Sequence, residues 1–131
     1  MAKKILIIDD EKDLAAMVKL RLEANGFSVS EGFTAKEGLE KAEKERPDLI
    51  LLDIMLPDSD GYQLCQKLKS NPRTSSIAII IFTASSLKDL AKKAMQAGAV
   101  DYVIKPFEPK ELLEKINKAL ERRWAKPKRR F

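Results

Sequence analysis

The sequence predicts an α/β fold in which a doubly wound, five-stranded parallel sheet is flanked by five helices. Short apolar runs alternate with amphipathic segments of roughly 10 to 15 residues, which is the pattern of strand–helix units. The apolar runs show little polar alternation, as expected for strands that are buried on both faces. The 131 residues, of which 44% are hydrophobic, suffice for one domain with its own core. Strict alternation of strands and helices places helices on both faces of the sheet.

Each predicted strand is a short apolar run, and the runs differ in strength. The run at residues 27–30 is the weakest, whereas the run at 77–82 contains three consecutive isoleucines and is the most apolar. The run at 49–52 contains no polar residue, which favours burial on both of its faces. In chain order, the predicted strands are residues 4–8, 27–30, 49–52, 77–82 and 102–104.

The helices between these strands are predicted from apolar periodicity and from capping residues. Gly26 stands where a left-handed cap would end the first helix. Thr34 and Glu37 have the spacing of a capping box, and residues 86–89 repeat this spacing before the fourth helix. Pro109 suits the first turn of the last helix. The predicted helices are residues 12–25, 34–45, 60–69, 86–97 and 109–120.

The residue composition excludes several function classes. One cysteine and no histidine exclude an internal disulfide, a Cys/His metal cluster and a nucleophile paired with histidine. Cys65 falls inside a helical pattern and is expected to be a buried, inert thiol. No apolar run is long enough for a secretory signal or a membrane span. We therefore expect a cytoplasmic protein, without membrane insertion, whose chemistry rests on carboxylates, lysine and hydroxyls.

The net charge of +5 is concentrated at the C-terminal end of the chain. Residues 121–131 contain six basic residues and one acidic residue, so residues 1–120 are balanced in charge. We expect a domain over residues 1–120, followed at 121–131 by the basic end of the last helix and a tail or linker stub. The tail has two interpretations. It could contact nucleic acid weakly, with Trp124 available for stacking, or it could be a solvated helix end, and we favour the second.

Chemically capable residues stand at the carboxyl ends of four of the five predicted strands. Asp9 and Asp10 follow the first strand, and Asp53 follows the third. Thr83 ends the fourth strand, and Lys105 follows the fifth. Each residue taken alone could be a helix cap or a loop residue. Ligands of open parallel sheets bind beyond the carboxyl ends of the strands, so the joint pattern predicts a site there.

These residue types favour transfer of a phosphoryl group. Carboxylates that gather at one place repel each other and need a cation or protons, and oxygen ligands suit magnesium. Magnesium beside Asp53 could bridge that carboxylate and a phosphoryl oxygen. Lys105 would supply a compact positive charge for a second oxygen, and the Thr83 hydroxyl would donate a hydrogen bond to a third. Together these groups predict formation of an aspartyl phosphate.

The sequence resembles the receiver domains of bacterial two-component response regulators over roughly residues 3–120. This set of motifs, in this order, is highly specific. The resemblance implies a CheY-like, flavodoxin-like fold with the strand order 2-1-3-4-5. The motifs are ILIIDDE at residues 5–11, LILLDIMLPDSDG at 49–61, IIIFTA at 79–84 and GAVDYVIKPF at 98–107.

The resemblance implies a signalling switch rather than a metabolic enzyme, with autophosphorylation and autodephosphorylation as its only chemistry. Asp53 would accept a phosphoryl group from a sensor histidine kinase or a histidine phosphotransfer protein. Mg²⁺ would be held by Asp53 together with Asp9, Asp10 and the backbone carbonyl of Met55.

The resemblance also implies which residues transmit the switch. Thr83 would move toward the phosphoryl group, and Tyr102 would swing inward behind it, although Tyr102 could also be an ordinary core aromatic. Lys105 would pair with the phosphate, oriented by a cis peptide bond to Pro106. The fourth helix, the last strand and the final helix would present the changed face to an output domain or partner protein. A phosphorylation-dependent homodimer is one form that this partnership could take.

Two other functions fit the residues less well. A haloacid dehalogenase-like phosphohydrolase would need a second aspartate two residues after Asp53, where Met55 stands instead. A nucleotide-binding domain would need a glycine-rich phosphate loop, but the five glycines form neither a GxGxxG motif nor a Walker A motif.

Overall fold

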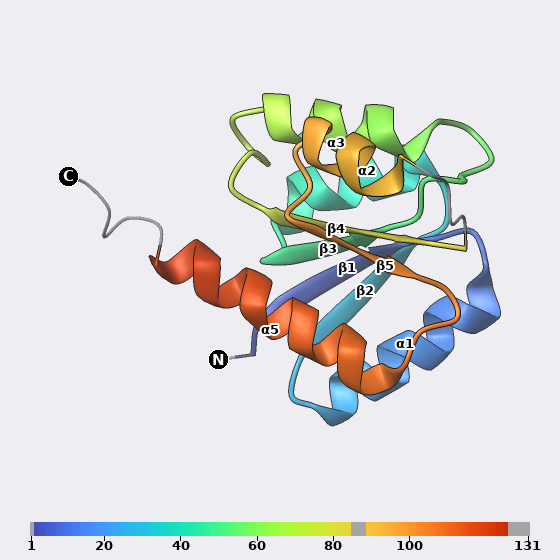
Figure 1. The fold of residues 1–131 in the computed structure, drawn as a ribbon, viewed down its shortest axis with the longest axis vertical. Helices are drawn as coiled ribbons and strands as arrows, with labels where there is room; N and C mark the ends of the chain where they lie inside the picture. Colours follow the sequence, from blue (N-terminus) through green and yellow to red (C-terminus); the bar gives the residue numbers. More distant parts are fainter. Residues whose placement is uncertain (1, 85–88, 126–131) are drawn as a thin grey trace.

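The computed structural model describes residues 2–84 and 89–125, in which five strands alternate with five helices. The strands form one parallel sheet in the order β2-β1-β3-β4-β5, which confirms the predicted doubly wound fold (Figure 1). The strands are β1 (Lys4–Ile8), β2 (Ser28–Gly32), β3 (Leu49–Leu52), β4 (Ala78–Thr83) and β5 (Asp101–Ile104).

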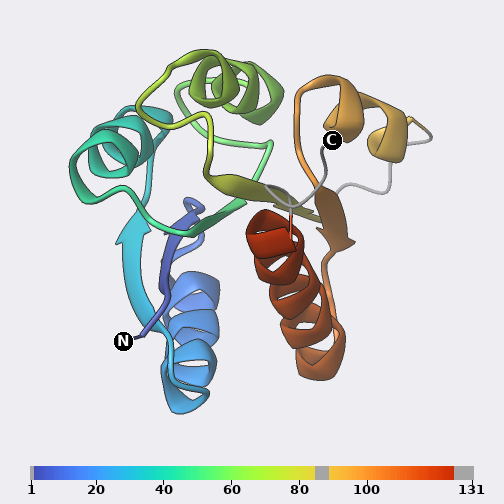
Figure 2. The ribbon, with the colours of Figure 1, turned by 90° about the vertical axis from the view of Figure 1, so that its left-hand side faces the viewer.

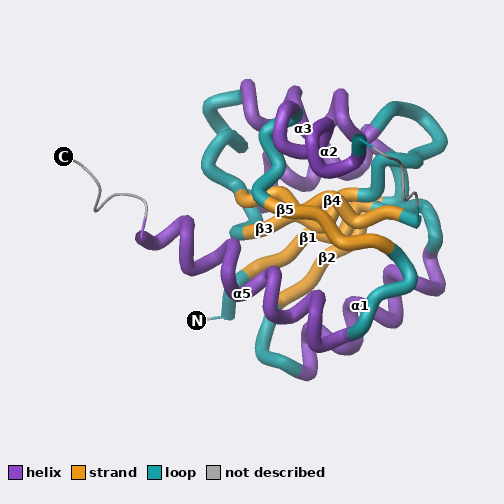
Figure 3. Tube along the Cα trace, viewed as in Figure 1, coloured by secondary structure: helices purple, strands orange, loops and turns teal. Residues whose placement is uncertain are grey.

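The helices cover the sheet on both faces. Figure 2 shows α1 and α5 on one side of the sheet and α2, α3 and α4 on the other. Figure 3 shows the same three layers, with the strands enclosed between the two groups of helices. The helices are α1 (Lys12–Ala24), α2 (Ala35–Glu45), α3 (Gly61–Ser70), α4 (Leu90–Gln96) and α5 (Pro109–Ala125).

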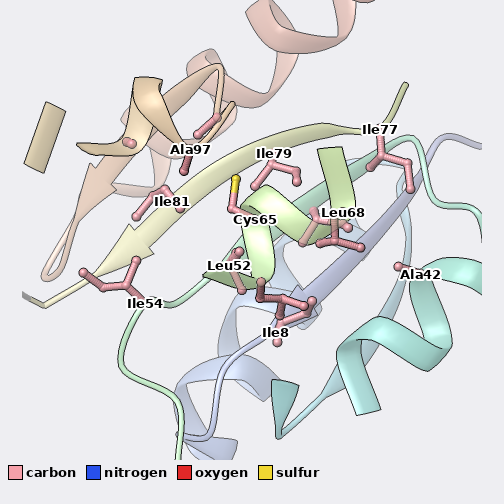
Figure 4. Packing of buried hydrophobic residues seen from close by; sticks show 14 of the residues in the cluster. Ile8, Ala42, Leu52, Ile54, Cys65, Leu68, Ile77, Ile79, Ile81 and Ala97 are labelled. Carbon is pink, nitrogen blue, oxygen red and sulfur yellow. The ribbon is translucent and has the colours of Figure 1, made fainter. Parts of the chain in front are cut away.

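The three central strands are apolar because both of their faces are covered. Successive side chains of a strand point to opposite faces, so neighbours in the sequence join different cores. Ile7 belongs to the core covered by α1 and α5, whereas Ile8 belongs to the core covered by α2, α3 and α4. Figure 4 shows the second of these cores, in which Cys65 lies among aliphatic side chains. Cys65 is buried as predicted, and burial raises the pKa of its thiol to about 11, which disfavours the reactive thiolate.

Most element boundaries lie within a residue of the prediction, and the larger differences concern β2 and α4. β2 begins one residue later than predicted and extends to Gly32, because it follows β1 in register from Lys4–Ser28 to Ile8–Gly32. α4 begins at Leu90, and the preceding N-cap residue, Asp89, makes no side-chain capping hydrogen bond. The predicted capping box at residues 86–89 begins outside the described residues.

The last helix is described from Pro109 to Ala125, so it includes the first part of the segment 121–131, where the sequence predicts the basic end of the last helix and a tail. The predicted apolar stripe of α5 contributes Leu112, Ile116 and Ala119 to the core that it shares with α1. Residues 126–131, the remainder of the predicted tail, lie outside the described part of the chain. Among the described residues, no helix is both long enough and apolar enough to cross a membrane.

Candidate functional site

The sheet positions two buried aspartates side by side. The Asp9 amide donates to the Gly32 carbonyl (3.0 Å), and the Asp53 amide donates to the Ile8 carbonyl (2.9 Å). Backbone hydrogen bonds between strands therefore continue one residue beyond β1 and β3, which holds both aspartates at the carboxyl edge of the sheet. Asp9 is fully buried and Asp53 is 4% exposed.

A third carboxylate joins them at the surface. Carboxylate oxygens of Asp9, Asp10 and Asp53 all lie within 4.8 Å of one another, and Asp10 is the exposed member. The structure therefore brings together the three aspartates that the sequence singled out. Carboxylates at this separation disfavour each other's charge, so the cluster needs cationic partners.

Lys105 provides one such partner from the loop after β5. Its Nζ lies 2.6 Å from Asp9 Oδ2 and 3.3 Å from Asp53 Oδ2. The ammonium group also lies 3.1 Å from Glu11 Oε1 and 4.7 Å from the centroid of the Phe82 ring. One buried ammonium group thus faces three carboxylates and an aromatic face. The peptide bond from Lys105 to Pro106 is cis.

The environment raises the pKa of both Asp9 and Lys105, which favours the charge of Lys105 and disfavours the charge of Asp9. Burial raises the pKa of Asp9 more than the hydrogen bond from Lys105 lowers it, so the net pKa lies above the ordinary value. Burial lowers the pKa of Lys105, but the Asp9, Asp53 and Glu11 carboxylates raise it further, so it also ends above its ordinary value. Lys105 therefore stays cationic at neutral pH, while the charge of Asp9 remains under-neutralised.

Local turns orient the two buried carboxylates. Asp53 Oδ1 accepts a hydrogen bond from the Met55 amide (3.0 Å), and Asp9 Oδ1 accepts one from the Glu11 amide (2.9 Å). In both residues the other oxygen, Oδ2, faces Lys105. These short-range bonds keep the side chains of Asp9 and Asp53 directed at the same ammonium group.

The loop after Asp53 depends on a glycine. The amide of Gly61 donates to the Ile54 carbonyl (2.9 Å), and Met55 pairs with Asp60 in an isolated antiparallel bridge. A Cβ atom on Gly61 would lie 2.3 Å from Ile54 Cα and 2.5 Å from the Asp53 carbonyl oxygen. Any other residue at this position would push the loop away from Asp53, the phosphoacceptor candidate. The glycine that ends the predicted motif is therefore required because there is no space for a side chain.

The two predicted switch residues lie on neighbouring strands. Thr83 is the last residue of β4, is fully buried, and accepts the Lys105 amide at its carbonyl (2.8 Å). Tyr102 lies on β5 and packs against the core that contains α4. Lys115 of α5 donates to the Tyr102 carbonyl (2.7 Å) and lies 5.1 Å from the centroid of its ring. Thr83 is thus hydrogen-bonded to the backbone of Lys105. Tyr102 instead contacts the core that contains α4 and Lys115 of α5.

Two residues in direct contact with Lys105 were missed by the site prediction. Glu11 stands next to the predicted metal ligands in the sequence, which is a signal that could have included it. The position of the Phe82 ring beneath the ammonium group has no such signal, because an apolar run does not reveal which of its residues lies under a given loop.

Sequence comparison relates this chain to known regulators. The family model for the response regulator receiver domain matches residues 5–117. Response regulator ArlR of Staphylococcus saprophyticus is 42% identical over 119 residues, which are 91% of this chain and 53% of that protein. The alkaline phosphatase synthesis transcriptional regulatory protein PhoP of Bacillus subtilis is 37% identical over 122 residues, which are 93% of this chain and 50% of that protein.

Structure comparison agrees with the sequence matches. A CheY-like response regulator receiver domain protein from Methanospirillum hungatei superimposes with a TM-score of 0.90 at 35% identity, over 96% of this chain and 99% of that one. This chain spans about half the length of the curated relatives that it matches. The named relatives are regulators rather than metabolic enzymes. The matched residues, the shared fold and the strand order show that this chain belongs to the response regulator receiver domain family of two-component signalling.

Proposed function

We propose that this domain accepts a phosphoryl group on Asp53 from a phosphohistidine, carried by a sensor histidine kinase or a histidine phosphotransfer protein. The observation that carries the proposal is the buried Asp53 carboxylate, whose Oδ2 lies 3.3 Å from Lys105 Nζ within a cluster of three aspartates. A buried carboxylate beside a buried cation is positioned both to attack phosphorus and to have its product stabilised.

The transfer step would involve few groups of this chain. A carboxylate oxygen of Asp53 attacks phosphorus, and the bond from phosphorus to the donor's imidazole nitrogen breaks with its electron pair going to nitrogen. The product is an acyl phosphate on Asp53 and a neutral histidine on the donor, because the other ring nitrogen of the phosphohistidine carries a proton when the bond breaks. The ammonium of Lys105 would then pair with one phosphoryl oxygen, and the Thr83 hydroxyl would donate to another.

The carboxylate cluster fits Mg²⁺. Asp9, Asp10 and Asp53 offer hard oxygen ligands within 4.8 Å of one another, and the Met55 carbonyl would be a further ligand. Burial raises the pKa of Asp9 despite the hydrogen bond from Lys105, and a bound divalent cation would offset this cost of burying the carboxylate. When bound, Mg²⁺ would neutralise the carboxylates and the phosphoryl oxygens during transfer.

The response to phosphorylation would appear on the face formed by α4, β5 and α5. Tyr102, which is half-buried against α4, and Thr83 at the end of β4 connect the pocket to this face. Met95 and Ile104 are exposed there, with 74% and 39% of their surfaces accessible. This face would bind an output domain, a partner protein or, after phosphorylation, a second copy of the chain.

The domain at residues 1–120 and the basic segment at 121–131 would have different functions. We assign the receiver function to residues 1–120 and propose that residues 121–131 are the basic end of α5 followed by a tail or linker. The basic residues of this segment would contact nucleic acid only weakly or indirectly.

Intact-mass measurement after incubation with acetyl phosphate tests the proposal directly. We expect one phosphoryl adduct on the wild-type protein in the presence of Mg²⁺ and none on Asp53→Asn or in metal-free buffer. Asp60→Asn, which alters an exposed carboxylate on the same loop, serves as the matched control and keeps the adduct. If the adduct turns over too fast to detect, Mg²⁺-dependent binding of beryllofluoride replaces it as the readout. A folded protein that forms neither the adduct nor the beryllofluoride complex would contradict the proposal.

A further inference from the structure

The first turn of α2 receives an unusual cap. Thr34 Oγ1 accepts the Glu37 amide (3.0 Å), as the capping-box spacing predicts. The two preceding amides, those of Ala35 and Lys36, donate to Oδ1 and Oδ2 of Asp58 at 2.7 Å and 3.1 Å. A single carboxylate, more than 20 residues away in the chain, therefore uses both oxygens to satisfy this helix N-terminus.

Asp58 belongs to the loop that also carries the phosphoacceptor candidate. The base of the loop at residues 53–60 is held by the Met55–Asp60 bridge and by the close approach of Gly61 to Ile54. Asp58 lies at the exposed tip of this loop and connects it to α2. The loop is thus closed at its base by contacts between its own two ends, and its tip is attached to a different helix.

The charge of Asp58 strengthens this attachment. The N-terminus of a helix carries partial positive charge, which favours a carboxylate. The hydrogen bond from the Ala35 amide lowers the pKa of Asp58 more than burial raises it, and the Lys36 amide lowers it further, so the pKa lies below its ordinary value. Asp58 therefore remains ionised, and both of its hydrogen bonds are charge-assisted at neutral pH.

We propose that Asp58 is a positioning residue for the phosphorylation site, because its double cap of α2 holds the loop at residues 53–60 and with it the Met55 carbonyl. The inference rests on the proposed function, in which that carbonyl is a ligand of Mg²⁺. Mg²⁺ requires nearly ideal octahedral geometry, so a ligand on a loosened loop binds it less well. Asp58 itself contacts neither the metal ligands nor the reacting atoms.

The test compares Asp58→Ala with Asp58→Asn. Both variants remove the same negative charge, but the asparagine oxygen can still accept a hydrogen bond from one α2 amide. We expect Asp58→Ala to weaken Mg²⁺ binding about tenfold, the lower end of the range for lost outer-shell partners, and Asp58→Asn to weaken it less. Titration calorimetry on the unphosphorylated proteins measures the affinity, and amide hydrogen exchange at Ala35 and Lys36 reports the cap. Ser59→Ala is the control on the same loop and should match the wild type.

Phosphorylation by acetyl phosphate gives a second readout. The rate for Asp58→Ala should fall at low Mg²⁺ and return to the wild-type rate at saturating Mg²⁺, because only the metal ligand has been loosened. Mg²⁺ affinities that are weakened equally in the two Asp58 variants would overturn the inference in favour of a pure charge effect. Wild-type affinity in both variants, with faster exchange at Ala35, would reduce Asp58 to a helix cap. If Asp58→Ala fails to fold, weaker Mg²⁺ binding by Asp58→Asn than by Ser59→Ala, with faster exchange at Ala35, still supports the inference, and equal binding by these two variants overturns it. A wild-type protein that binds no Mg²⁺ would overturn the proposed function as well.

Discussion

Asp9 and Asp58 carry the same chemical group in opposite electrostatic environments. Asp9 is buried at the end of β1, and its burial raises its pKa although Lys105 donates a hydrogen bond to it. Asp58 is exposed, and the Ala35 amide of α2 lowers its pKa. The folded domain therefore favours the charge of Asp58 and disfavours the charge of Asp9.

The difference reflects two roles. Asp58 attaches a loop to α2, whereas Asp9 belongs to a cluster that could bind a cation. Two backbone amides donate hydrogen bonds to the Asp58 carboxylate, so its negative charge is stabilised without any ligand. The pocket around Asp9 contains more negative charge than Lys105 can neutralise, and the remaining imbalance is what a divalent cation would relieve. Unfavourable electrostatic interactions that a bound ligand would relieve are typical of functional sites.

The largest effect on stability is expected from removal of the cation in the pocket. Lys105→Met leaves Asp9 and Asp53 buried without their partner, which should lower the free energy of unfolding by roughly 3 kcal/mol in Mg²⁺-free buffer at neutral pH. Urea unfolding followed by circular dichroism measures this loss. The control is Lys115→Met, which removes the partly exposed pair with Asp101 and should cost less than about 1 kcal/mol. Equal losses in the two variants would contradict the contrast between buried and exposed pairs.

A smaller effect, of opposite sign, is expected for Asp9→Asn. An acid whose pKa is raised on folding destabilises the protein as the pH rises through its unfolded and then its folded pKa. Without Mg²⁺, Asp9→Asn should therefore match the wild type at acidic pH and become more stable at neutral pH, by the order of 1 kcal/mol. Adding Mg²⁺ should stabilise the wild type and have much less effect on the variant. A variant that is less stable than the wild type in metal-free neutral buffer would show that Lys105 fully compensates Asp9.

Much of the pocket follows from the sequence because parallel strands deliver their carboxyl ends to one edge of the sheet. Asp9 and Asp53 could be placed there from the apolar runs that precede them, and their burial follows from the same runs. The strand order came only from the resemblance to a family, since apolar runs do not reveal which strands are neighbours. The contact between Lys105 and Glu11 requires that order and a side-chain direction, so the residues alone did not predict it.

The link between Asp58 and α2 shows a different limit of sequence reasoning. The capping box predicted that Thr34 caps the Glu37 amide, because the two residues are close in the chain. It did not predict where the Ala35 and Lys36 amides find a partner, because that partner lies in a distant loop. Local hydrogen bonds can be read from spacing, whereas bonds between distant segments need the packed structure.

The smallest expected effect, and the one that completes the comparison with Asp9, is the pH dependence of Asp58→Asn. The pKa of Asp58 is lowered on folding, so its contribution to stability is full above the unfolded value of about 3.9 and is lost as the pH falls through the folded pKa. Wild type and variant should therefore unfold with equal free energy in strong acid, and the wild type should become the more stable as the pH rises. Urea unfolding over a series of acidic pH values measures the two curves. This divergence is opposite in sign to that of Asp9→Asn. Curves that diverge in the same direction for both variants would mean that folding shifts the pKa of the two carboxylates in the same direction.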